Sequence, residues 1–180
     1  MPEKNYGFFT GEVKTLWGTN SKKDSEMQLL EDFSYTDPDG KVWKAEADIW
    51  IDGASIPSIF WGPTIGSPYV GDYRRASVVH DAAFYTRPDT AMNVHKMFYY
   101  AMRCDGTRKS KALLMYFAVV MYKPNWDRTR KITGWTMENI QDVLAETLLE
   151  VDSTNSLDEI EIKFRENWNR PLLDGDELYL

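Results

Sequence analysis

The feature that most constrains the fold is a run of eleven residues, 112–122, that contains no charged side chain. The pattern predicts a helix from Lys109 to about Met121. Because a helix that is apolar on all sides must be covered on all sides, we expect this one at the centre of the core. A membrane span needs about 20 apolar residues, so the run is too short to cross a bilayer.

The chain before this helix changes from strand to helix periodicity. Short apolar or alternating runs predict strands at residues 13–16, 27–30, 42–45 and 49–51, and the turn sequence Asp37-Pro-Asp-Gly40 is typical of a hairpin. Helical spacing begins at Arg74 and ends before Pro88. Asp89 is the expected cap of a second helix, which should stop near Asp105-Gly106.

Two more helices are predicted in the last part of the chain. One follows Thr136 and runs to about Val151, and another follows Ser156, which begins a capping-box sequence. We therefore predict an α+β fold, with a small N-terminal antiparallel β-sheet, a helical bundle and a C-terminal acidic helical extension. The predicted division is a core domain, residues 1–135, and an acidic extension with a tail, residues 136–180.

Composition and charge exclude several classes of protein. With 43% hydrophobic residues the chain can build a core, and a lone cysteine, Cys104, excludes an internal disulfide framework. The sequence pI of about 4.9 argues against nucleic-acid binding. Neither a signal peptide nor a transmembrane segment is expected. Residues 136–180 carry 3 basic and 12 acidic side chains, a net charge of −9, whereas residues 1–135 carry +2.

The residues with catalytic potential are His80 and Asp81, preceded by the loop Asp52-Gly-Ala-Ser-Ile-Pro57. Asp52, Gly53 and Ser55 favour a rigid turn that could support a site. A histidine can take a proton from water near neutral pH, and a neighbouring carboxylate can bind a hard cation. By themselves these residues fit better with a loop, a core histidine and a surface carboxylate.

These segments together resemble a known family. The runs WKAEADIWIDGASIPSIFW, GDYRRASVVHD and MFYYAM are similar to a phage-associated family known as domain of unknown function 1353. The resemblance extends over residues 8–126 and implies genomic context and fold rather than an activity.

A fainter resemblance is to small bacterial calcium-dependent phospholipases of the His-Asp class. It implies that His80 is a general base, that Asp81 and the loop at Asp52 and Gly53 bind calcium, and that the residue at position 95 orients His80. In both families that residue is usually an aspartate, but here it is His95. A neutral imidazole cannot stabilise an imidazolium as a carboxylate does, so we expect weak catalysis.

The histidine at position 95 leaves two interpretations open. His80 and His95, with Asp81 or Asp52, could form a transition-metal site, since imidazole suits zinc or iron. The alternative is a buried, hydrogen-bonded histidine pair without turnover. Both require the ring nitrogens to lie within about 8 Å of each other across two packed helices. No cofactor is required by the sequence, and a divalent metal ion is the one that these residues could bind.

The sequence predicts a virion-associated structural or accessory protein of a phage, built on a degenerate hydrolase-like core. The alternative is an active phage-encoded ester hydrolase, phospholipase-like or other, that uses His80 as its base. The expected partners are other phage structural proteins or a second copy, contacted through residues 136–180, whose charge and apolar side chains both suit docking. The expected location is the virion or the cytoplasm of the infected host.

Overall fold

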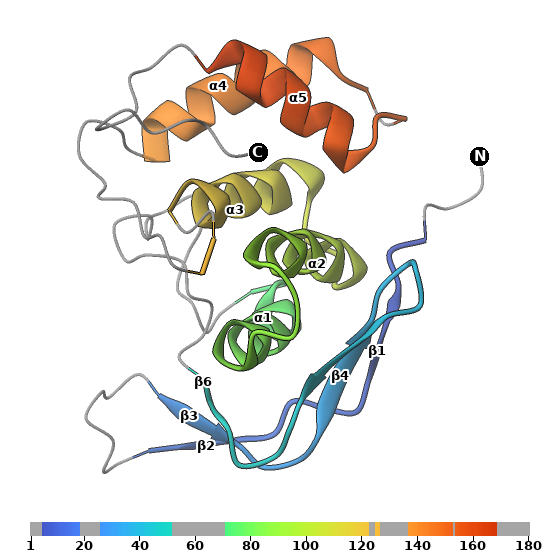
Figure 1. Ribbon diagram of the computed structural model, residues 1–180, viewed down its shortest axis with the longest axis vertical. Coiled ribbons are helices and arrows are strands. Elements are labelled where there is room, and N and C mark those ends of the chain that lie inside the picture. The colour runs from blue at the N-terminus through green and yellow to red at the C-terminus, as the bar shows by residue number, and fades with distance from the viewer. Residues whose placement is uncertain are drawn as a thin grey trace.

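The computed structural model describes residues 5–18, 26–51, 71–122, 125–126, 137–152 and 154–168. Within these residues six short strands precede five helices (Figure 1), which confirms the α+β class. The strands are β1 (Phe8–Thr10), β2 (Thr15–Trp17), β3 (Met27–Leu29), β4 (Phe33–Thr36), β5 (Val42–Ala45) and β6 (Trp50–Ile51). The helices are α1 (Arg74–Thr86), α2 (Ala91–Cys104), α3 (Lys109–Tyr122), α4 (Met137–Glu150) and α5 (Leu157–Asn167).

The strands form two small antiparallel sheets, ordered β1-β4-β5 and β2-β3-β6, instead of the single sheet expected from the sequence. The predicted hairpin joins β4 to β5. Its turn is held by the Asp37 carboxylate, which accepts hydrogen bonds from the backbone N–H groups of Asp39 at 3.0 Å and Lys41 at 2.9 Å. Strands β1 and β4 were not predicted from the sequence.

The helices are stacked in chain order on the sheets. Helix α1 contacts β4, β5 and β6, α2 packs on α1, and α3 packs on α2. The α4–α5 pair lies beyond α3, on the side away from the strands (Figure 1). Helix α3 is thereby covered on both sides, and residues 112–121 are all buried, as the uncharged run predicts. This stacking places α1 and α2, which carry the two histidines, between the sheets and the central helix.

The acidic extension is part of the same hydrophobic core. Ile140, Leu157, Ile160 and Phe164 are at most 3% exposed and belong to one cluster with α3. These four side chains are therefore covered by this chain itself. The domain division at residues 135 and 136 stays a prediction, but apolar docking through these side chains does not fit their burial.

The cap of α2 corrects one sequence prediction. The N-cap residue is Thr90, which has extended backbone angles and whose hydroxyl accepts the N–H of Asn93 at 3.2 Å. Asp89, predicted as the cap, lies one residue earlier. Its carboxylate accepts hydrogen bonds from the Thr90 N–H at 2.6 Å and the Asn93 side-chain amide at 2.8 Å. The capping box predicted at Ser156 is confirmed, with Glu159 as its second member.

Candidate functional site

The centre of the candidate site is a pair of histidines that joins α1 to α2. Nε2 of His80 lies 3.1 Å from Nδ1 of His95, which is hydrogen-bonding distance. Both side chains are fully buried. The predicted approach of the two rings is confirmed, because each histidine lies on the helix face that packs against the other helix.

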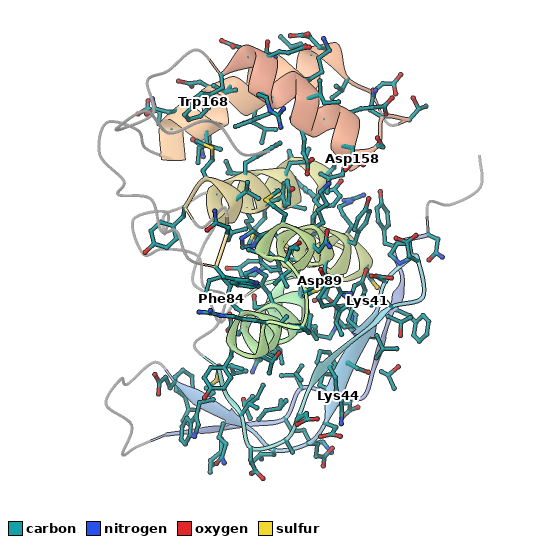
Figure 2. The ribbon with its side chains drawn as sticks, in the orientation of Figure 1. Lys41, Lys44, Phe84, Asp89, Asp158 and Trp168 are labelled. Atoms are coloured by element: carbon teal, nitrogen blue, oxygen red, sulfur yellow. The ribbon has the colours of Figure 1, made fainter. Side chains whose placement is uncertain are left out.

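Aromatic rings surround the pair. Phe98 of α2 stacks on the His80 ring with 4.4 Å between centroids, and Phe84 of α1 lies 5.9 Å away. Trp126 packs edge-on against Phe84 at 5.1 Å. Figure 2 shows Phe84 beside α1 and α2. Apolar walls of this kind lower the local dielectric constant around His80 and strengthen the electrostatic interactions made there.

The second ring nitrogen of His80, Nδ1, is buried and has no hydrogen-bond partner among the described residues. Burial, together with repulsion by His95, holds the pKa of His80 well below its usual value of 6.5. His80 is therefore neutral near pH 7. A neutral imidazole carries one N–H and one lone pair, so a pair joined through Nε2 leaves either a lone pair or an N–H at Nδ1.

The other predicted site residues are not all placed beside this pair. Asp81 follows His80 on α1 and is also buried, at 7% exposure. Among the described residues, no group of three or more His, Cys, Asp or Glu side chains is arranged to hold a metal ion. His80, His95 and Asp81 therefore do not form such a site by themselves. The predicted loop residues Asp52, Gly53 and Ser55 lie outside the described residues.

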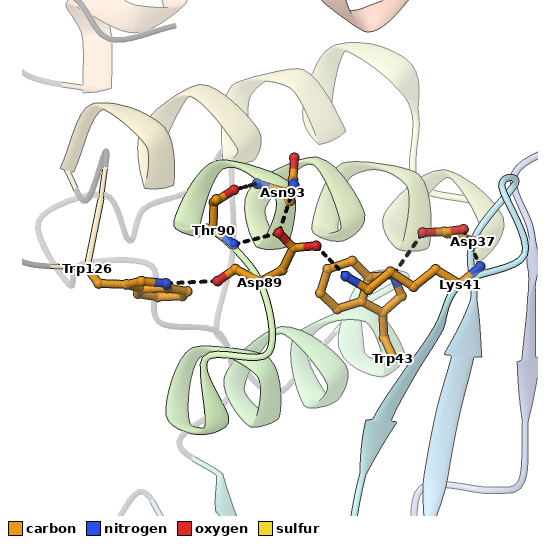
Figure 3. A network of polar contacts seen from close by, with 7 residues as sticks. All are labelled: Asp37, Lys41, Trp43, Asp89, Thr90, Asn93 and Trp126. Atoms are coloured by element: carbon orange, nitrogen blue, oxygen red, sulfur yellow. Dashed lines mark hydrogen bonds and ion pairs between the residues drawn. The ribbon is translucent and has the colours of Figure 1, made fainter.

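A polar network that the sequence did not predict lies next to the histidine pair. The Trp126 indole N–H donates to the backbone carbonyl of Asp89 at 2.9 Å, and the Asp89 carboxylate forms an ion pair with Lys41 of the hairpin (Figure 3). The Lys41 ammonium lies 3.9 Å from the centroid of Trp43, whose N–H donates to Asp37. The network ties the hairpin to the start of α2. Lys41 and Asp89 are 48 residues apart, and no local sequence pattern predicts a contact over that separation.

The network also forms part of the wall of a cavity of about 320 Å³ between the hairpin, α2 and α5. Both lysines in the wall are already paired with carboxylates. Lys41 pairs with Asp89, and Lys96 pairs with Asp158 at 2.5 Å, which ties α5 to α2. Each of these two lysines thus has a structural role, because its ion pair holds two elements of the fold together.

The depressed pKa of His80 predicts a pH-dependent stability. Below pH 6.5 the unfolded chain binds a proton at His80 that the folded chain does not, so the free energy of unfolding should fall as the pH falls. The slope for one proton is at most about 1.4 kcal/mol per pH unit. This slope should extend from pH 6.5 down to the lowered pKa of His80 in the folded state. Above pH 6.5, His80 should no longer change the free energy of unfolding.

Urea unfolding at a series of pH values measures this slope. His80→Gln, which cannot be protonated, should reduce the slope between about pH 6.5 and pH 5, where carboxylates contribute little. An unchanged slope in the variant would mean that His80 is not the group responsible.

Comparison with known proteins places the chain in a family. The model of the family described as "Protein of unknown function (DUF1353)" matches residues 27–119, just over half of the chain. The chain belongs to this family, and the resemblance noted in the sequence is confirmed. The matched region contains the strands from β3 onward and both histidines.

Two curated relatives come from Sinorhizobium fredii (strain NBRC 101917 / NGR234). The uncharacterized protein y4jT is 44% identical over 108 residues, which is 60% of this chain and 32% of the relative. The uncharacterized protein y4iH is 38% identical over 104 residues, or 57% of this chain and 43% of the relative. The aligned part thus makes up less than half of either relative.

No solved structure matches the chain. Among the described residues, no helix is long and apolar enough to cross a membrane.

Proposed function

We propose that this protein is a hydrolase in which His80 is the general base. The observation that carries the proposal is the arrangement of the two ring nitrogens of His80. Nε2 is engaged by His95 at 3.1 Å, while Nδ1 is left without a partner among the described residues. If Nε2 carries the hydrogen and donates it to His95, Nδ1 presents a lone pair that can accept a proton from water.

The proposed chemistry is the hydrolysis of an ester. As a water molecule attacks the carbonyl carbon, Nδ1 of His80 takes one of its protons, and the tetrahedral intermediate forms. When the intermediate collapses, the bond to the alcohol oxygen breaks and the imidazolium returns the proton to that oxygen. His95 acts as a positioning residue, because its hydrogen bond to Nε2 fixes the ring orientation and the tautomer of His80.

The same arrangement limits the rate. During proton transfer His80 becomes an imidazolium in a fully buried position, and its hydrogen-bond partner is another histidine rather than a carboxylate. A neutral partner offsets little of the developing positive charge. We therefore expect slow turnover, consistent with the lowered pKa of His80.

The experiment compares the wild type with His80→Gln on p-nitrophenyl butyrate, with and without calcium. General-base catalysis contributes about 10²- to 10⁴-fold, so the variant should lose at least about 100-fold in kcat. Tyr85→Phe, an exposed change on the same helix (83% exposed), is the matched control and should keep the wild-type rate. Equal rates in the wild type and His80→Gln, with both proteins folded by circular dichroism, would contradict the proposal.

A second candidate is a non-catalytic accessory protein of a phage particle. The observation that favours it is the His95 partner, which would make the pair a hydrogen-bonded structural element that links α1 to α2. This candidate predicts no turnover and co-sedimentation of the protein with particles. Its partners would be phage structural proteins, and its location the virion or the infected cell. Turnover that depends on His80 would exclude the non-catalytic interpretation.

A further inference from the structure

The outer face of α4 carries a continuous acidic stripe. Glu138, Asp142, Glu146 and Glu150 follow one another at intervals of four residues and are all exposed. Side chains four residues apart are neighbours on a helix, and like charges at this spacing destabilise it. Glu146 and Glu150 also lie toward the C-terminal end, where the helix dipole disfavours negative charge and where α4 has no basic residue.

Partners within the chain account for only part of this stripe. Glu150 is contacted by the amide of Asn167 at 2.9 Å and by Lys163 at 3.6 Å. Within the described residues, Glu138 and Glu146 make neither a hydrogen bond nor an ion pair. Glu138 lies in the first turn, where the helix dipole favours negative charge, but Glu146 lowers the stability of α4 without a compensating contact among the described residues. The charge of Glu146 is therefore available for a contact with another molecule.

An apolar groove runs along the border of the stripe. It has a volume of about 260 Å³ and lies between α3 and α4. Its lining is mainly apolar and consists of Ser110, Lys111, Leu114, Gln141, Leu144, Ala145 and Leu148. Because a helix turns about 100° per residue, Leu149 falls between Ala145, at the edge of the groove, and Asp142 of the stripe. Leu149 is 89% exposed, so the apolar surface continues out of the groove to the acidic stripe.

We infer that the α3–α4 groove binds a basic amphipathic helix of a partner protein. Such a helix has apolar side chains at intervals of three and four residues, which fit a groove of this kind. Its lysine and arginine side chains on the adjoining face would lie opposite Glu138, Asp142, Glu146 and Glu150. The apolar contacts supply the binding energy once water is expelled, and the complementary charges steer the encounter and fix the orientation. This interaction is independent of the histidine pair and of the proposed hydrolysis.

The test uses the full chain and a fluorescent peptide of about 14 residues with leucine on one face and lysine on the other. A peptide of the same composition in scrambled order is the control for charge alone. By fluorescence anisotropy, the amphipathic peptide should bind at least about tenfold more tightly than the scrambled one, and binding should weaken as salt is added.

Two variants on α4 separate groove binding from general attraction. Ala145→Phe fills the groove without changing the charge, and Glu146→Gln removes one charge of the stripe. Each should weaken binding by at least about fivefold, whereas Glu12→Gln, the same charge change at an exposed position on the N-terminal segment, should not. Equal binding of the two peptides, or no effect of Ala145→Phe, would overturn the inference. Salt-sensitive self-association that Ala145→Phe abolishes would also overturn it, because the occupant would then be a second copy of this chain.

Discussion

Deletion of residues 137–180 is expected to leave a protein that no longer unfolds cooperatively. Without α4 and α5, the outer side of α3 would be exposed, including the ring of Phe117, which stacks on Phe164 with 3.7 Å between centroids and an interplanar angle of 9°. Polar ties would be lost as well, because Tyr116 of α3 donates a buried hydrogen bond to Glu161. A truncated chain with this much apolar surface should be aggregated or molten.

A single substitution measures the same contact in a chain that still folds. Phe164 is fully buried, and Phe164→Ala should lower the free energy of unfolding by about 3–5 kcal/mol, the cost of removing a buried phenylalanine and leaving a cavity. Ile162→Ala, two residues away and 53% exposed, is the control and should change stability by less than about 1 kcal/mol. Urea unfolding followed by circular dichroism gives both values. A soluble 1–136 fragment with a sharp unfolding transition would show that the acidic helices are a separable extension after all.

His95→Asp is expected to raise the rate of ester hydrolysis by at least about tenfold, which corresponds to about 1.4 kcal/mol in the activation free energy. The aspartate would accept the Nε2 hydrogen of His80 with a charged oxygen and would stabilise the imidazolium that forms during proton transfer. It would also raise the pKa of His80, because an opposite charge favours the protonated form.

The pH dependence of the rate separates this effect from a simple structural repair. A base must be unprotonated, so the rate falls as the pH drops through the pKa of His80. In the wild type that fall should lie well below pH 6.5, and in His95→Asp it should move to higher pH. His95→Asn is the matched control, since it has nearly the same shape and no charge, and its rate should stay near that of the wild type. An equal gain in His95→Asn would rule out charge as the cause.

The parts of the fold that the sequence predicts well are those with long, regular patterns. The uncharged run 112–122 predicts a central helix, and α3 is buried as expected because eleven residues are enough to define all sides of a helix. The capping box at Ser156 is predicted correctly for a similar reason, since its two hydrogen bonds depend only on residues three apart. By contrast, β1 pairs with β4 across more than twenty residues, and no local pattern specifies that pairing.

The approach of the two histidines is predictable from the sequence, but the chemistry of the pair is not. Helical spacing places His80 and His95 on the facing sides of two helices, and they do meet. The sequence does not indicate that Nδ1 of His80 is left without a partner among the described residues, because that depends on every side chain packed around it. The burial of Ile140, Ile160 and Phe164 against the rest of the chain could not be predicted either. The same spacing of apolar residues is found in a helix that packs on the core of its own chain and in one that packs on a partner protein.

The protonation state of the His80 ring at pH 7 is the most direct test of the central claim, because base catalysis requires a free lone pair at Nδ1. Nitrogen-15 NMR of the histidine side chains in the full chain distinguishes a protonated ring nitrogen from an unprotonated one. We predict that Nε2 of His80 carries the hydrogen and that Nδ1 is unprotonated, with His95→Asn used to assign the two residues. A hydrogen on Nδ1 of His80 at pH 7 would contradict the account, since that nitrogen could then not take a proton from water.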